Sequence, residues 1–136
     1  MVKAKKEKMS WKNEIKEKFR RFFWHGYWTD PVIFFSLVLA IISNLGMWVV
    51  TWQLVEPASR PMILHYNVYF GVDAIGDWKN IFLMPTLALV ILLVNTILSR
   101  FFYYKEKLIA YLFAGMAFLV QLLMAVGLGS IILINF

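Results

Sequence analysis

The chain has 136 residues, of which 61% are hydrophobic and 16% charged, whereas soluble domains average roughly 45–50% and about 25%. A soluble globule of this length would expose more apolar surface than it could cover. This composition argues against a soluble domain, a disordered chain and a coiled coil, and it indicates a small integral membrane protein. The chain has no cysteine, which excludes disulfides, thiol catalysis and thiolate metal sites.

The positive charge is concentrated at the amino terminus. Nine of the 14 Lys and Arg residues and three acids lie within residues 1–23, so this segment carries the whole net charge of +6. A basic segment followed by long apolar runs suits the anionic headgroups of an inner leaflet. Nucleic acid is the rival partner for such a segment. Because aromatic residues alternate with the charges at helical spacing, we expect lipid and no nucleic acid.

Residues 10–28 have the pattern of an amphipathic helix that lies on the membrane surface. Their apolar residues recur at helical spacing on one face, with Lys and Arg on the other, as interfacial helices require. An alternative is a cytoplasmic helix that packs on a partner protein. Tryptophan is typical of the headgroup region. The side chains predicted to contact lipid headgroups are Lys12, Lys16, Arg20, Arg21, Trp24 and Trp28.

Three uncharged apolar runs follow, and each is long enough for a helix that crosses a hydrocarbon core of about 30 Å. They cover residues 32–55, 81–99 and 108–134. Asp30 and Pro31 suit the N-cap and first position of the first helix, and Asp77 or Asn80 could cap the second. A spanning segment must satisfy its own backbone hydrogen bonds in lipid, which favours helices. The predicted fold is therefore a single all-α membrane domain over residues 1–136, with an interfacial segment over 1–30.

The distribution of Lys and Arg predicts the orientation. The amino-terminal segment has nine basic residues and the turn at 100–107 has three, whereas the connector at 56–79 has two. The positive-inside rule then places the amino terminus in the cytoplasm and the carboxyl terminus outside. The 56–79 connector becomes an extracytoplasmic loop of a multi-pass protein in the cell membrane.

The 56–79 loop contains one strictly alternating stretch, residues 62–70, which predicts a strand with one apolar face. A lone strand is unstable, so it could pair with residues 72–75, dock on the helix ends, or pair with a neighbouring subunit. Gly71 and Gly76 mark turns. The loop residues predicted to contact a partner are His65, Asn67, Gly71, Asp73, Asp77 and Trp78.

The loop carries a family resemblance. Pro61, His65-Tyr66-Asn67, Gly71-Val72-Asp73 and Trp78-Lys79, followed by Pro85, resemble a domain of unknown function at the front of SdpI-type bacterial immunity proteins. The resemblance covers about residues 32–99. This chain has one extra residue between Asn67 and Gly71, and Ile63 stands where that motif has proline. The resemblance implies a bacterial inner-membrane protein with an immunity-like or sensor-like role.

His65, Asp73 and Asp77 together could in principle bind zinc or a similar ion. The sequence lacks a paired-histidine spacing, and strand and turn structure, or contact with a partner or ligand, explains these residues better. We therefore predict no metal site and no cofactor. No catalytic motif is found either, because the chain has no nucleophile elbow, no H-E-x-x-H and no phosphate-binding loop. The sequence predicts a protein that is not an enzyme.

Three amides lie inside the predicted membrane helices, where polar residues are costly and often functional. Asn44 and Gln121 fall at the same depth, and Asn95 lies nearer the cytoplasmic end. We predict that Asn44 and Gln121 form a hydrogen bond across helices, within one subunit or between subunits. Small residues at four-residue steps on the third helix would allow close packing. They are Ala110, Ala114, Ala117, Ala125 and Gly129.

Two functions are consistent with these features. The first is a structural or interaction subunit that assembles with itself or within a larger complex and uses the outer loop as its contact surface. The second is a small oligomeric channel or transporter lined by Asn44, Asn95 and Gln121. The two differ in whether the amides face water or a dry helix contact.

Overall fold

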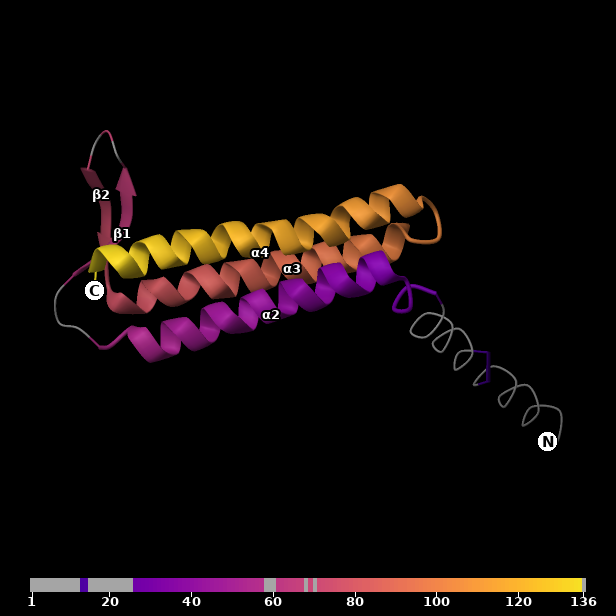
Figure 1. Ribbon diagram of the computed structural model, residues 1–136, viewed down its shortest axis with the longest axis horizontal. Coiled ribbons are helices and arrows are strands. Elements are labelled where there is room, and N and C mark those ends of the chain that lie inside the picture. Colours follow the sequence, from indigo (N-terminus) through magenta and orange to yellow (C-terminus); the bar gives the residue numbers. More distant parts are fainter. Residues whose placement is uncertain (1–12, 15–25, 58–60, 68, 70, 136) are drawn as a thin grey trace, which may run out of the picture.

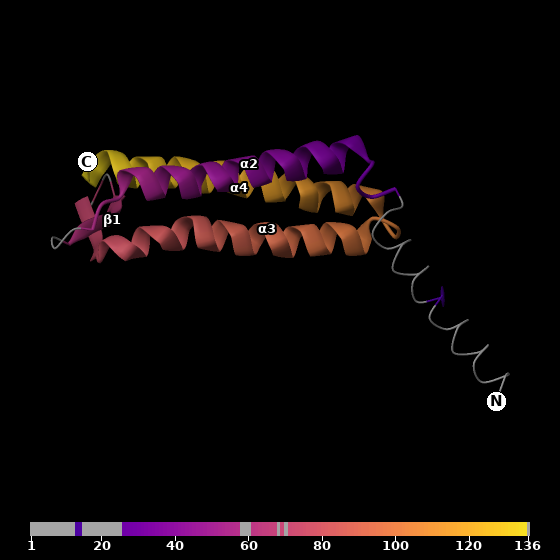
Figure 2. The same cartoon turned by 90° about the horizontal axis from the view of Figure 1, so that it is seen from below.

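The computed structural model describes residues 13–14, 26–57, 61–67, 69 and 71–135, with only the backbone described for residues 65–67 and 73. Three long helices run side by side along one axis (Figures 1 and 2). They are α2 (Pro31–Leu54), α3 (Leu83–Phe102) and α4 (Lys107–Asn135). All three are long and apolar enough to cross a membrane. This confirms the predicted helical class and its three candidate spans.

The helix ends differ slightly from the predicted ones. The predicted start of the first span is confirmed, because the Asp30 carboxylate accepts a bond from Val32 N and Pro31 occupies the first turn. A short 3₁₀ helix, η1 (Trp78–Phe82), precedes α3, and Asp77 caps it by accepting from Lys79 N at 3.0 Å. Helix α3 continues to Phe102, beyond the predicted end at residue 99, so Arg100 lies in its last turn.

The segment between α2 and η1 forms a β-hairpin. Strand β1 (Met62–Asn67) pairs antiparallel with β2 (Gly71–Gly76), which is the first of the three predicted arrangements. The strand is shorter than predicted, because β1 ends at Asn67 and Tyr69 lies in the turn. Gly71 opens β2 with φ +78°, a conformation that favours glycine. Each strand also contains an irregularity, which interrupts the simple alternation read from the sequence.

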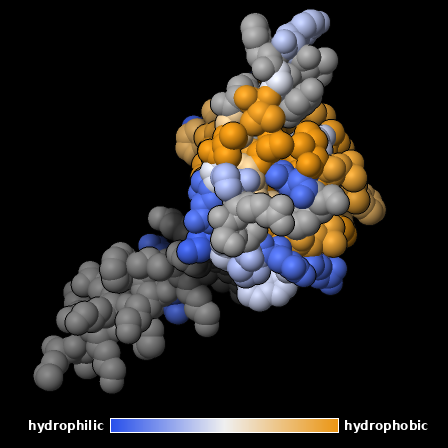
Figure 3. All heavy atoms as spheres, turned by 90° about the vertical axis from the view of Figure 1, so that its left-hand side faces the viewer, coloured by the Kyte–Doolittle hydropathy of each residue, from blue (hydrophilic) through white to orange (hydrophobic). Residues whose placement is uncertain are grey.

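The buried residues form two apolar clusters along the bundle. The first lies toward the α3–α4 turn and includes Ile33, Leu37 and three alanines of α4. The second lies toward the hairpin and includes Met47, Met62, Ile81 and Leu128. Between them lies a polar layer, which Asn44 and Gln121 supply. Most other large apolar side chains on the three helices are exposed, as expected of surfaces that face lipid, and Figure 3 shows them around the hairpin end of the bundle.

Candidate functional site

The polar layer joins all three helices through two side-chain amides. Asn44 Nδ2 donates to Gln121 Oε1 at 3.0 Å and to the Pro85 carbonyl at 3.1 Å. Gln121 Nε2 donates to the Ala88 carbonyl at 2.7 Å. Both amides are buried, at 3% and 0% exposure. The layer is therefore a buried contact in which α2, α3 and α4 are linked by hydrogen bonds.

The sequence prediction left open whether the Asn44–Gln121 bond forms within one chain or between chains, and the structure shows it within the chain. Ala110, Ala114 and Ala117 are fully buried on the same face of α4 as Gln121, whereas Ala125 and Gly129 are only half-buried. The small side chains let the helices approach closely enough for the amides to meet.

Asn95 does not join this layer. Its side chain donates to the Ile91 carbonyl of its own helix at 3.0 Å and is half-buried. Asn95 lies about two turns from Ala88 and nearly three turns from Pro85 along α3, which is too far for a shared contact with Asn44 or Gln121. The three amides therefore do not meet within one chain, and a channel lined by all three in an oligomer stays a prediction.

A second polar cluster lies at the opposite end from the hairpin and was missed by the sequence analysis. Asp30 Oδ1 caps α2, while Oδ2 accepts from Tyr111 OH at 2.8 Å and lies 3.0 Å from Tyr103 OH. Tyr103 OH is also 3.0 Å from the Gly26 carbonyl, and its single hydrogen can serve one acceptor at a time. This cluster connects the segment before α2 with the α3–α4 turn.

The surroundings of Asp30 and Tyr103 in this cluster shift the pKa values of both groups. Burial by itself would raise the pKa of Asp30, but hydrogen bonds from Tyr111, Tyr103 and the amides of Val32 and Ile33 outweigh it and lower that pKa. Burial, the hydrogen bond with Asp30 and the charge of Asp30 raise the pKa of Tyr103 to about 12. The folded cluster therefore favours an ionised Asp30 beside a protonated Tyr103.

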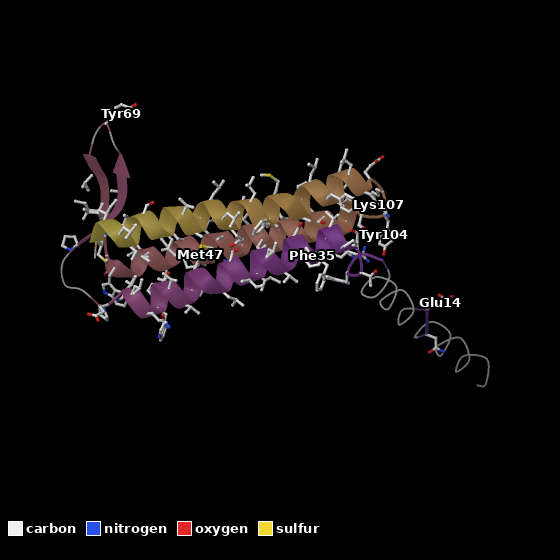
Figure 4. The ribbon with its side chains drawn as sticks, in the orientation of Figure 1. Glu14, Phe35, Met47, Tyr69, Tyr104 and Lys107 are labelled. Carbon is white, nitrogen blue, oxygen red and sulfur yellow. The ribbon has the colours of Figure 1, made fainter. Side chains whose placement is uncertain are left out.

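Arg100 lies among aromatic rings beside this cluster. Its guanidinium is 5.5 Å from the Tyr27 ring centroid and 4.8 Å from that of Tyr104, within the range of cation–π contacts. Tyr27 is fully buried and packs edge-on against Tyr103. Tyr104 and Lys107 mark this end of the bundle in Figure 4. The sequence signal was present, because Asp30, Tyr103 and Tyr111 all lie near helix ends on one predicted side of the membrane.

One side chain at the end of α4 forms hydrogen bonds with the hairpin. Asn135 Oδ1 accepts from Ile63 N at 2.9 Å, and Asn135 Nδ2 donates to the Ile63 carbonyl at 2.7 Å. The side-chain amide thus bonds to β1 as a neighbouring strand would. Docking on a helix end was among the arrangements predicted for this strand, but the alternation in residues 62–70 could not identify Asn135, which lies far away in the sequence.

The predicted loop residues are distributed along the hairpin and its base. In the ladder His65 pairs with Ala74 and Asn67 with Gly71, while Asp73 occupies the irregularity of β2. Asp77 caps η1, and Trp78 packs edge-on against Phe82 beneath the hairpin. The side chains of His65, Asn67 and Asp73 lie outside the described residues. The absence of a metal site at His65, Asp73 and Asp77 therefore stays a prediction, and the described side chains form no cluster of three metal ligands.

The structure describes only part of the amino-terminal segment for which the sequence predicts an interfacial helix. Lys12, Lys16, Arg20, Arg21 and Trp24 lie outside the described residues, and so does most of the predicted interfacial helix. Trp28 is described, is 43% exposed and packs edge-on against Tyr27. An exposed tryptophan beside a helix start is compatible with a position at headgroup depth.

Comparisons with protein-family models, with curated proteins and with solved structures find no match to this chain. The resemblance to the domain of SdpI-type immunity proteins therefore stays a prediction.

Proposed function

We propose that this protein is a non-enzymatic interaction subunit of the membrane, and that it assembles with a second copy of itself through the β-hairpin. The observation that carries the proposal is the position of the hairpin. It stands across the axis of the bundle and extends beyond it (Figure 1), so it reaches sideways along the membrane surface. A neighbouring copy in the same membrane lies within its reach.

The surface of the hairpin suits a protein contact. Tyr69 at its tip is 91% exposed and points away from the bundle (Figure 4). Val72 and Ile75 of β2 are 42% and 63% exposed. Apolar and aromatic side chains on a projecting element are typical of contact surfaces.

The outer edge of β2 offers backbone hydrogen bonds. Among the described residues, β2 bonds only to β1, whereas β1 is bonded on its other side to Asn135 at Ile63. An unpaired strand edge is a template for another strand. A second copy could present the same edge, which gives a closed dimer with two-fold symmetry.

The bundle itself supports a structural role. No buried side-chain nitrogen or oxygen in the described part of the chain lacks a hydrogen-bond partner. The amides that a channel would need for its lining, Asn44 and Gln121, are already bonded to each other and to backbone carbonyls. A water-filled path along them would first have to break these bonds. The same proposal places the basic amino-terminal segment on the anionic inner leaflet.

Single cysteines test the self-assembly, because the natural chain has none. In liposomes, Val72→Cys and Ile75→Cys should form covalent dimers on mild oxidation. Thr29→Cys, exposed at the other end of the bundle, is the matched control and should stay monomeric. Native mass spectrometry of the gently extracted protein should show dimers. Val72→Lys should reduce the proportion of dimer, since an edge lysine opposes strand pairing, whereas Val72→Thr should leave it unchanged.

A monomer in native spectra, together with no cross-link at either hairpin position, would contradict this assembly. Cross-links at Thr29→Cys alone would place the contact at the other end of the bundle.

A further inference from the structure

Two adjoining hollows lie on the lipid-facing side of α3 and α4 below the hairpin. Their volumes are about 590 and 600 Å³, and Leu64, Met84 and Ile131 border both. The first extends along α3 from Asn80 to Val90, and the second along α4 from Val120 to Ile134. Together they form one groove, which we call the Leu64 groove.

The groove is apolar except at one end. The hydroxyls of Thr86 and Ser130 border it, but they donate to the Phe82 and Val126 carbonyls of their own helices. The remaining polar side chain is Asn80, which is exposed in η1 where the chain begins its second span. The groove therefore combines a long apolar wall with a single amide near the membrane surface.

This pattern matches the part of a phospholipid where an acyl chain joins the polar ester and phosphate groups. From Asn80 to Val90 the wall measures roughly 15 Å at the rise of a helix, a length that an acyl chain can follow. An acyl chain requires no hydrogen bonds, whereas its ester and phosphate oxygens accept them. Lys79, next to Asn80, is exposed outside the groove, and its ammonium lies 5.6 Å from the Trp78 ring centroid.

We propose that the Leu64 groove binds a membrane phospholipid. One acyl chain lies along α3 and α4, and the ester or phosphate oxygens contact the Asn80 amide. This lipid belongs to the leaflet at the hairpin end, so the site is separate from the headgroup contacts predicted for the amino-terminal segment. It does not depend on the hairpin-mediated assembly.

A small residue keeps the groove open. Gly127 borders it opposite Met84, and a Cβ at Gly127 would come within 3.9 Å of Met84 Cε. Alanine therefore fits, while a branched side chain would extend into the hollow. Gly115 on the same helix borders neither hollow and has open space around it. Both substitutions remove a helical glycine, so neither should impair the helix.

The experiment uses the full chain in vesicles of phosphatidylethanolamine and phosphatidylglycerol that contain a phospholipid with a photoreactive acyl chain. Cross-links should concentrate on Met84, Leu87 and Ile131 in the wild type. Gly127→Leu should lower these cross-links severalfold, while Gly115→Leu should leave them unchanged. Asn80→Leu should shift the cross-links along the groove, because the lipid loses its polar contact.

Native mass spectrometry gives an independent readout. One retained phospholipid per chain is expected for the wild type and Gly115→Leu, and its loss for Gly127→Leu. Uniform labelling of all lipid-facing residues, or equal retention by Gly127→Leu, would overturn the proposal. Disulfide-linked dimers of Met84→Cys or Ile131→Cys would also overturn it, because they would show that a second copy fills the groove.

Discussion

At the scale of single residues, the polar layer of Asn44 and Gln121 decides how the three helices fit together. Each amide bonds to the other and to a carbonyl of α3, so the layer fixes both the rotation and the depth of each helix. A helix shifted along its axis by one turn would leave buried amides without partners, which is costly away from water. The layer therefore specifies one packing among the many that apolar surfaces would allow.

Replacing Gln121 by leucine should destabilise the folded bundle by about 1–2 kcal/mol, since it removes hydrogen bonds worth about 1 kcal/mol each in membrane proteins. Asn95→Leu is the matched control, because Asn95 bonds only to its own helix, and it should have little effect. Thermal unfolding in detergent measures both. The double variant Asn44→Leu/Gln121→Leu should cost less than the sum of the single changes. Unchanged stability of Gln121→Leu would contradict a stabilising role for the layer.

The Asp30 cluster should make stability depend on pH in two ranges. The folded-state pKa of Asp30 is lowered, so its contribution is present above the unfolded value near 3.8 and is lost as the pH falls through the folded pKa. The folded-state pKa of Tyr103 is raised from 10.0 to about 12, so its contribution is complete below pH 10 and disappears by about pH 12.

The alkaline range is tested by comparing unfolding of the wild type and Tyr103→Phe between pH 9 and about pH 12. The wild type should be more stable at the lower end, and the difference should vanish at the upper end. Phe35→Leu, which changes an exposed side chain without an ionisable group, is the control and should change stability equally across this range. A constant offset between wild type and Tyr103→Phe would contradict the linkage.

At the scale of elements, the helices could be predicted because their signals are local. Uncharged runs, the Asp30-Pro31 start and the charged α3–α4 turn all lie within a few residues of the feature they determine. The hairpin was only partly predictable, since alternation predicted a strand but did not choose its partner. The contact of Asn135 with Ile63 joins residues 72 positions apart, and no local pattern encodes it.

The hairpin should lose its fixed position when Asn135 is replaced by leucine, because Ile63 then loses both side-chain hydrogen bonds. The backbone amides of residues 62–67 should exchange with deuterium several times faster, while those in the middle of α4 should not change. Ser130→Ala is the control, since its hydroxyl bonds only to its own helix. Equal exchange in Asn135→Leu and wild type would mean that the apolar packing of Met62 and Leu64 is sufficient to position the hairpin.

At the scale of the whole molecule, charge separates the two ends of the bundle. Arg100, Lys105 and Lys107 lie at the α3–α4 end, whereas Lys79 is the only described basic residue at the hairpin end. This asymmetry predicts the orientation and needs no contact between residues. The Asp30 cluster, by contrast, depends on three segments that meet only in the folded bundle, so the sequence analysis missed it.

The orientation can be measured with an impermeant maleimide on cells, using Tyr69→Cys at the hairpin tip and Glu106→Cys in the α3–α4 turn. Tyr69→Cys should react in intact cells, and Glu106→Cys only after permeabilisation, because basic residues stay on the cytoplasmic side. Replacing the nine basic residues of the amino-terminal segment by glutamine should produce a mixture of both patterns, since this segment holds most of the charge bias. The reversed labelling of Tyr69→Cys and Glu106→Cys, with the basic residues kept, would place the hairpin in the cytoplasm. A partner of the hairpin would then have to be sought there.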